Sequence, residues 1–198
     1  MGEHSSPGGA KVGMWLFLCT EILLFGGLFL LYSVYRYRNP QDFRAASQEL
    51  DRILGTLNTA VLITSSLSVA LAGHVLAKRR PERAALLLGA SLALGAAFLV
   101  VKGFEWGAKF AHGLYPGSPV LLARAKGEIL YFGLYFMMTG LHALHVLIGM
   151  GLLATVLVLV RRDRVSPEHP VLLENSGLYW HLVDMIWIFL FPLFYLIG

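Results

Sequence analysis

Five long apolar runs constrain this chain more than any other feature of its sequence. They cover residues 13–35, 57–77, 84–104, 130–160 and 178–197. A helix needs about 20 apolar residues to cross the roughly 30 Å hydrocarbon core of a membrane, and soluble domains rarely carry runs of that length. Only 14% of the residues are charged, which leaves no soluble domain to place. The sequence therefore predicts an all-α, polytopic membrane protein, with five transmembrane helices bundled into a single membrane domain over residues 1–198.

The segments between the runs carry signals for turns and a short helix. Asn39 suits a helix cap and Pro40 a first helical position, so we expect a surface helix from there to about Leu54. Residues 106–128 contain glycine, proline and charges, and we expect a loop outside the bilayer core. Pro192 interrupts the last run near its end.

The basic residues indicate the orientation of the chain. Their number ties between the two sides, but the compact clusters at 78–83 and 161–164 both lie on the side of the N-terminus, directly beside span ends. Such clusters favour the cytoplasm, so we expect the N-terminus inside and the C-terminus outside. The net charge of +4 is spread over loops, which indicates topology and no nucleic-acid partner.

Ionisable residues inside the runs are the candidate site. At about 1.5 Å per residue, Glu21 lies roughly 12 Å below the cytoplasmic surface. His142, His145, His181 and Asp184 fall in the same inner half, so we expect one polar layer. Intramembrane ionisable groups cost about 2.5–3.5 kcal/mol on insertion scales and are functional candidates by default. We expect Glu21 to handle protons, because no basic residue lies within two turns of it on its own helix.

The other ionisable groups are interpreted as a structural polar network. His142 and His145 are three residues apart and are expected to share a helix face. Glu105 lies at the outer end of its span, with Lys102 one turn before it as a partner. The network comprises His142, His145, His181, Asp184 and Glu105.

Three alternatives for these residues stay open. A metal could bind to His142, His145, His181 and Asp184 in a stand-alone membrane enzyme, a haem could lie between His181 and a histidine of the fourth run, or the chain could be a small proton-coupled transporter. We favour the structural network and expect no metal. The sequence shows no nucleophile motif, phosphate loop or dinucleotide fingerprint, so we expect no catalytic residue in this chain.

Several separated blocks resemble subunit III of the haem–copper respiratory oxidases, a family that serves cytochrome c oxidases and quinol oxidases. They are residues 13–25 (GMWLFLCTEILLF), 57–63 (LNTAVLI), 102–106 (KGFEW), 139–149 (TGLHALHVLIG) and 179–187 (YWHLVDMIW). Glu21 matches the family's carbodiimide-reactive carboxylate. Longer members have seven spans, and this chain resembles their last five, the five-helix form found in bacteria.

The resemblance implies a non-redox subunit of a cytochrome c oxidase in a bacterial plasma membrane. Haem and copper would lie in partner subunits, and the complex would couple oxygen reduction to proton translocation. The family's subunit III packs on subunit I, works beside subunit II, supports proton uptake, stabilises the catalytic core and binds phospholipid in a cleft. A quinol oxidase subunit III and an accessory subunit of a nitric oxide reductase stay open as alternatives.

Overall fold

Every element is helical in the part of the chain that the computed structural model describes, residues 7–168 and 170–196. The elements are α1 (Pro7–Arg38), α2 (Pro40–Ser47), α3 (Arg52–Ala77), α4 (Pro81–Ala111), α5 (Pro119–Leu122), α6 (Lys126–Arg161), α7 (Val171–Phe191) and the π-helix η1 (Pro192–Leu196). Five helices are long and apolar enough to cross a membrane. The predicted all-α fold with five transmembrane helices is confirmed.

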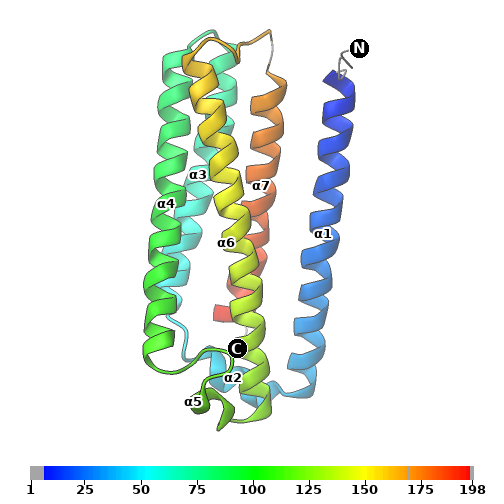
Figure 1. Cartoon of the computed structure of the whole chain (residues 1–198), viewed down its shortest axis with the longest axis vertical. Helices are drawn as coiled ribbons and strands as arrows, with labels where there is room; N and C mark the ends of the chain where they lie inside the picture. The colour runs from blue at the N-terminus through cyan, green and yellow to red at the C-terminus, as the bar shows by residue number, and fades with distance from the viewer. Residues whose placement is uncertain (1–6, 169, 197–198) are drawn as a thin grey trace.

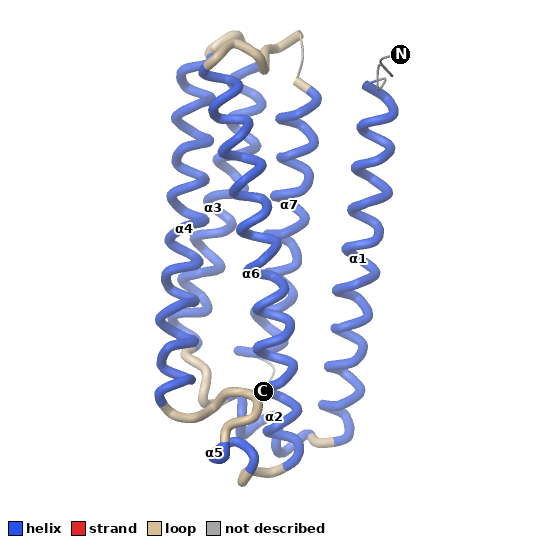
Figure 2. Tube along the Cα trace, viewed as in Figure 1, coloured by secondary structure: helices blue, strands red, loops and turns tan. Residues whose placement is uncertain are grey.

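The five long helices stand side by side, with their connections at the two ends (Figures 1 and 2). The start of α1, the α3–α4 turn and the α6–α7 link share one end, and α2, α5 and η1 gather at the other. The helix α1 stands at the edge of the bundle, where its side chains contact α7 and α6. Only 11% of its most apolar stretch is buried, against 56% for the last span. Most of α1 is therefore available to lipid or to another chain.

The helices extend beyond the runs that hydropathy picks out. The helix α4 continues to its end at Ala111, so the first part of the expected loop 106–128 is helical. The helices α6 and α7 begin at Lys126 and Val171, before the expected 130 and 178. Backbone hydrogen bonding does not stop where side chains turn polar, so a membrane helix can project past the hydrocarbon core.

The expected surface helix is shorter than predicted and does not reach Leu54. It ends at Ser47, and a turn separates it from α3. The side chain of Asp51 caps α3, because its Oδ1 accepts hydrogen bonds from the backbone N of Ile53 at 2.8 Å and of Leu54 at 3.2 Å. Asn39 makes no side-chain cap, although proline does occupy the first turn of α2 as expected.

Small residues hold the centre of the bundle together. The hydroxyls of Ser65 and Ser91 each donate to the other's backbone carbonyl, at 3.2 and 3.3 Å, and so join α3 to α4. Trp180 of α7 donates from Nε1 to Ser65 Oγ at 3.1 Å. Its ring lies where a Cβ on Gly149 or Gly95 would come within 3.0 Å of it. Small residues thus let the helices approach closely around one buried tryptophan.

The last turn of the chain depends on tyrosine hydroxyls. Pro192 has no backbone N–H, and the chain continues past it as η1. Tyr32 donates to the carbonyl of Leu193 at 2.6 Å, and Tyr131 donates to that of Phe194 at 2.7 Å. Backbone groups in a membrane need an internal partner, so these two hydroxyls stabilise an irregular helix end.

Candidate functional site

Glu21 and His145 form an ion-pair contact between α1 and α6. Nε2 of His145 lies 2.8 Å from Oε2 of Glu21, and both side chains are largely buried, with exposed fractions of 10% and 13%. On its other side, Nδ1 of His145 lies 2.7 Å from the backbone carbonyl of Leu141, one turn earlier in α6. The imidazole is therefore engaged at both nitrogens.

These two hydrogen bonds determine where the protons are. A carbonyl oxygen can only accept, so Nδ1 of His145 carries a hydrogen directed at Leu141. The short contact between Nε2 and Glu21 then needs one more proton, held by either partner. The pair is thus a carboxylic acid with a neutral imidazole, or a carboxylate with an imidazolium. Both forms have zero net charge, which suits a group inside a membrane.

Aromatic rings enclose this pair. Phe25 of α1 meets the His145 ring edge-on, with centroids 5.4 Å apart. Tyr179 of α7 lies almost parallel to the imidazole at 6.5 Å and donates its hydroxyl to the His145 carbonyl at 3.3 Å. Phe17 stacks on Tyr179 at 5.9 Å. These rings fix the imidazole plane and limit access of water to the shared proton.

His142 lies apart from this pair, contrary to the expectation that the two histidines share a face. Its ring is fully buried between Phe98 of α4 and Trp187 of α7, at centroid distances of 5.6 and 5.3 Å. Neither nitrogen makes a hydrogen bond to any described residue. At 3.6 residues per turn, positions three apart differ by about 60° in direction. His142 therefore contacts α4 and α7, whereas His145 contacts α1.

His181 and Asp184 lie on the α3 side of α7. Nδ1 of His181 is 2.6 Å from the hydroxyl of Ser66 on α3, so this histidine does tie the last span to a neighbour. Asp184 is buried, and the hydroxyl of Ser66 lies within hydrogen-bonding reach of its carboxyl group. Of the five residues expected in one polar layer, the structure joins only Glu21 and His145 directly.

Glu105 belongs to a separate buried cluster at the other end of the bundle. Lys102 donates from Nζ to Glu105 at 3.1 Å, the partner that their spacing predicts, and also to the hydroxyls of Tyr135 and Tyr195 at 3.0 and 2.9 Å. Both tyrosines donate to Oε1 of Glu105, at 2.6 and 2.5 Å. The two tyrosines were not expected as partners. They are 30 and 90 residues away in sequence, and no local spacing signals such contacts.

The geometry does not assemble the four-residue metal site kept open above. Among residues 7–168 and 170–196, no three His, Cys, Asp or Glu side chains come together to hold an ion. His145 is bound to Glu21 and a carbonyl, His142 lies between aromatic rings, and His181 is bound to Ser66. The histidines and Asp184 therefore lie in separate contacts, and Glu21 with His145 is the pair of ionisable residues that the structure joins among them.

Comparison with known proteins gives the family. The model of the family described as cytochrome c oxidase subunit III matches residues 1–198. The chain belongs to this family. Cytochrome c oxidase subunit 3 of Thermostichus vulcanus is 30% identical over 98% of this chain and 90% of its own length. The corresponding Synechocystis subunit is 33% identical over 99% of this chain and 79% of its own.

Quinol oxidases have relatives of this subunit III as well. Cytochrome bo(3) ubiquinol oxidase subunit 3 of Pseudomonas aeruginosa is 28% identical over 98% of this chain and 88% of its own length. The resemblance seen in the sequence is therefore confirmed. The chain is a multi-pass membrane protein, a subunit III of the haem–copper oxidases, and part of a multi-subunit oxidase complex.

Proposed function

We propose that this chain is the non-redox subunit III of a proton-pumping cytochrome c oxidase, and that Glu21 and His145 support its proton uptake. The observation that carries the proposal is the single proton that the geometry requires between Nε2 of His145 and Oε2 of Glu21. The pair lies in the membrane, at the junction of α1 with α6. An imidazole exchanges protons near neutral pH, and a carboxyl group hydrogen-bonded to it can share the proton.

The pair can move a proton without creating an isolated charge. Passing the proton between Glu21 and His145 exchanges a neutral pair for an ion pair of the same total charge. A proton that the carboxylate accepts from outside has to be matched by one that the imidazolium releases, so that the pair returns to zero net charge. The aromatic enclosure by Phe25 and Tyr179 supports this role, because it separates the site from the surrounding acyl chains.

The outer face of α1 supports packing against subunit I. Trp15, Leu16, Leu23 and Leu30 are each more than half exposed, so α1 presents an apolar surface next to the proton-exchange pair. A partner on this face would shield the pair and receive protons from it. Haem and copper belong to partner subunits in this proposal, with subunit II and phospholipid as further neighbours of the chain.

The charge distribution supports a bacterial plasma-membrane location with the N-terminus in the cytoplasm. The α3–α4 turn and the α6–α7 link hold the compact basic clusters, and both lie at the end where α1 begins (Figure 1). Basic clusters beside span ends favour the cytoplasmic side. Glu21 would then receive protons from the cytoplasmic side of the membrane.

Glu21→Gln in the assembled oxidase tests the proposal. We expect the complex to assemble, carbodiimide labelling of this chain to disappear and proton uptake to slow severalfold. Glu174→Gln is the matched control, because it removes a carboxylate from the other ion pair of α1, with Lys11 at 2.6 Å, where both side chains are about half exposed. Labelling that persists in Glu21→Gln, or unchanged proton uptake, would contradict the assignment.

A quinol oxidase is the second candidate for the complex. The Pseudomonas aeruginosa relative, named a ubiquinol oxidase subunit, supports it over nearly the same length of chain. The role of this subunit would be the same, and only the electron donor of the complex would differ. Steady-state assays of the purified complex with reduced cytochrome c and with a quinol separate the two candidates.

A further inference from the structure

A second polar connection crosses from α7 to α3, away from the Glu21–His145 pair. Nδ1 of His181 lies 2.6 Å from the hydroxyl oxygen of Ser66 on α3. The same hydroxyl is within hydrogen-bonding reach of the carboxyl group of Asp184, three residues after His181 on α7. A single hydroxyl group thus lies between an imidazole and a carboxyl group.

The carboxyl group of Asp184 is closed off from solvent. Both of its oxygens are enclosed by the protein, and the residue as a whole is 3% exposed. A carboxylate in such surroundings is unfavourable unless a cation balances its charge. A proton bound at Asp184 therefore has no direct path to water, and the hydroxyl of Ser66 is the neighbouring group that can pass it on.

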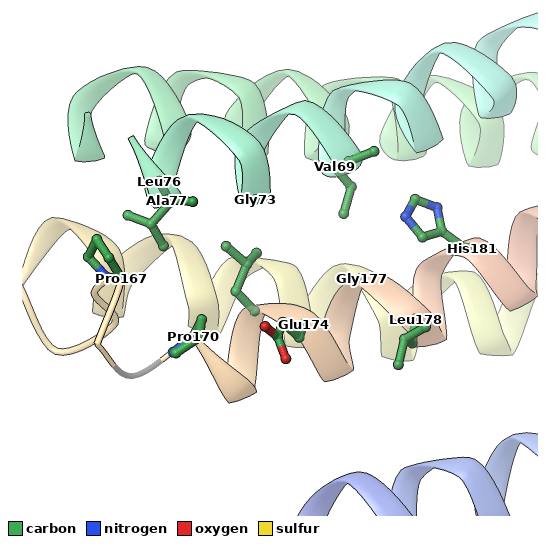
Figure 3. A pocket seen from close by; sticks show the side chains of 12 residues that line it. Val69, Gly73, Leu76, Ala77, Pro167, Pro170, Glu174, Gly177, Leu178 and His181 are labelled. Carbon is green, nitrogen blue, oxygen red and sulfur yellow. The ribbon is translucent and has the colours of Figure 1, made fainter. Parts of the chain in front are cut away.

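His181 differs from Asp184 because it lines an open cavity. This cavity has a volume of about 630 Å³ and lies between α3 and α7. Its walls extend from Ala77, the last residue of α3, and Pro167 in the α6–α7 link to His181. Figure 3 shows the His181 ring between the two helices, far from Pro167. The imidazole therefore faces a space that reaches the end of the bundle where α1 begins (Figure 1).

Other ionisable groups have little contact with this site. Among the described residues that line the larger cavity, Glu174 is the one other ionisable side chain, and its carboxylate pairs with Lys11. A smaller cavity of about 380 Å³ adjoins His181 and Asp184 and has no further ionisable residue in its described walls. The ionisable groups that α1 and α6 place near α7 are held in the contacts described above: Glu21, His142 and His145. The charge of the site therefore depends mainly on His181 and Asp184 themselves.

We propose that Asp184, Ser66 and His181 form a second proton-exchange site, in which Asp184 holds a proton that is exchanged with the cavity through Ser66 and His181. In the first state, the O–H of Asp184 donates to the Ser66 oxygen, and the O–H of Ser66 donates to Nδ1 of a neutral His181. Each polar group then has a partner, and the site carries no net charge.

Proton transfer along this connection needs no other reactant. The hydrogen of Ser66 moves to Nδ1 of His181 while the hydrogen of Asp184 moves to the Ser66 oxygen. Two O–H bonds break, and one O–H bond and one N–H bond form. The products are an Asp184 carboxylate and a His181 imidazolium, so the total charge is unchanged. The imidazolium can release the hydrogen of its other nitrogen to the cavity, and uptake of a proton there reverses the sequence.

Infrared spectroscopy of the purified oxidase complex after transfer from H2O to D2O tests the proposal. The C=O stretching band of a protonated carboxyl group shifts when deuterium replaces its hydrogen. The difference between the wild-type complex and the isosteric variant Asp184→Asn isolates the band of Asp184. We expect this band to be present in the wild type and to shift as D2O reaches the cavity.

Variants of the hydroxyl identify the path of the proton. Ser66→Ala removes the connection and should slow deuterium exchange at Asp184 at least tenfold, whereas Ser66→Thr keeps a hydroxyl and should exchange nearly as fast as the wild type. His181→Phe interrupts the connection at its other end and should slow exchange similarly. Ser68→Ala is the control, because the Ser68 hydroxyl donates to the Thr64 carbonyl within α3 at 3.0 Å and should not affect exchange.

Two results would overturn the proposal. One is the absence of a protonated carboxyl band that depends on Asp184, and the other is an exchange rate that Ser66→Ala and His181→Phe leave unchanged. The haem content of each preparation shows that the variant complex has assembled. Because the band belongs to Asp184, this experiment is independent of carbodiimide labelling and proton uptake at Glu21, and the two proposals fail separately.

Discussion

Nζ of Lys102 lies 3.1 Å from Oε2 of Glu105, one turn along α4, and both side chains are almost completely buried. The ammonium also lies 5.0–5.6 Å from the ring centroids of Tyr135, Trp187 and Tyr195. Two opposite charges in the interior of a membrane protein are tolerated because every polar atom of the pair is satisfied. The cluster joins α4, α6 and η1 at one end of the bundle.

Lys102→Met should therefore destabilise the chain strongly. It leaves the Glu105 carboxylate buried without its cation, and removing one partner of a buried pair costs about 3–5 kcal/mol. Thermal unfolding in detergent, followed by circular dichroism, measures the effect. Glu168→Gln is the control, since its pair with Arg79 is exposed and such pairs contribute about 0–1 kcal/mol. Equal melting temperatures for the two variants would contradict the structural role of the cluster.

Gly149→Ala should destabilise the centre of the bundle. The added Cβ would lie 2.7 Å from the ring of Trp180, and overpacking of this kind typically costs about 1–3 kcal/mol. Gly151→Ala, two residues along the same helix, meets no atom within 4 Å and should be neutral or slightly stabilising. A melting experiment that ranks the two variants in the opposite order would refute the packing described here.

Tyr131→Phe should loosen the π-helical end of the chain. The tyrosine hydroxyl donates to the carbonyl of Phe194 at 2.7 Å, and leaving a buried acceptor unpaired costs about 1–3 kcal/mol. Amide hydrogen exchange of residues 193–196 should accelerate in this variant. Tyr37→Phe removes a hydroxyl from a side chain that is 87% exposed and should leave exchange unchanged. Equal rates of amide hydrogen exchange at this end of the chain in the two variants would contradict the prediction.

The membrane fold and one of the polar contacts could be predicted from the sequence alone. A long apolar run crosses a bilayer as a helix, because a helix pairs its own backbone groups, so the five runs directly predicted five transmembrane helices. The pairing of Lys102 with Glu105 followed from their spacing on one helix. The helix ends were predicted less well, because hydropathy marks the hydrocarbon core and α4 continues helical through Trp106 to Ala111.

Contacts between different helices could not be predicted from the spacing of residues in the sequence. Glu21 and His145 are 124 residues apart, and their contact depends on how α1 leans on α6. His142 has the same residue type, depth and helix, yet about 60° of rotation places it among Phe98 and Trp187. A common depth is therefore not sufficient for contact, because the direction of each side chain decides its neighbours.

The most direct test compares the purified oxidase complex with and without this chain. If this chain is a non-redox subunit that supports proton uptake, both preparations should show the same haem absorption spectrum per catalytic core. The depleted preparation should take up protons more slowly. Adding back the purified chain should restore the rate, whereas adding back Glu21→Gln should not. Two results would contradict the account. One is a loss of haem in proportion to the amount of this chain that is removed, and the other is an unchanged rate of proton uptake after its removal.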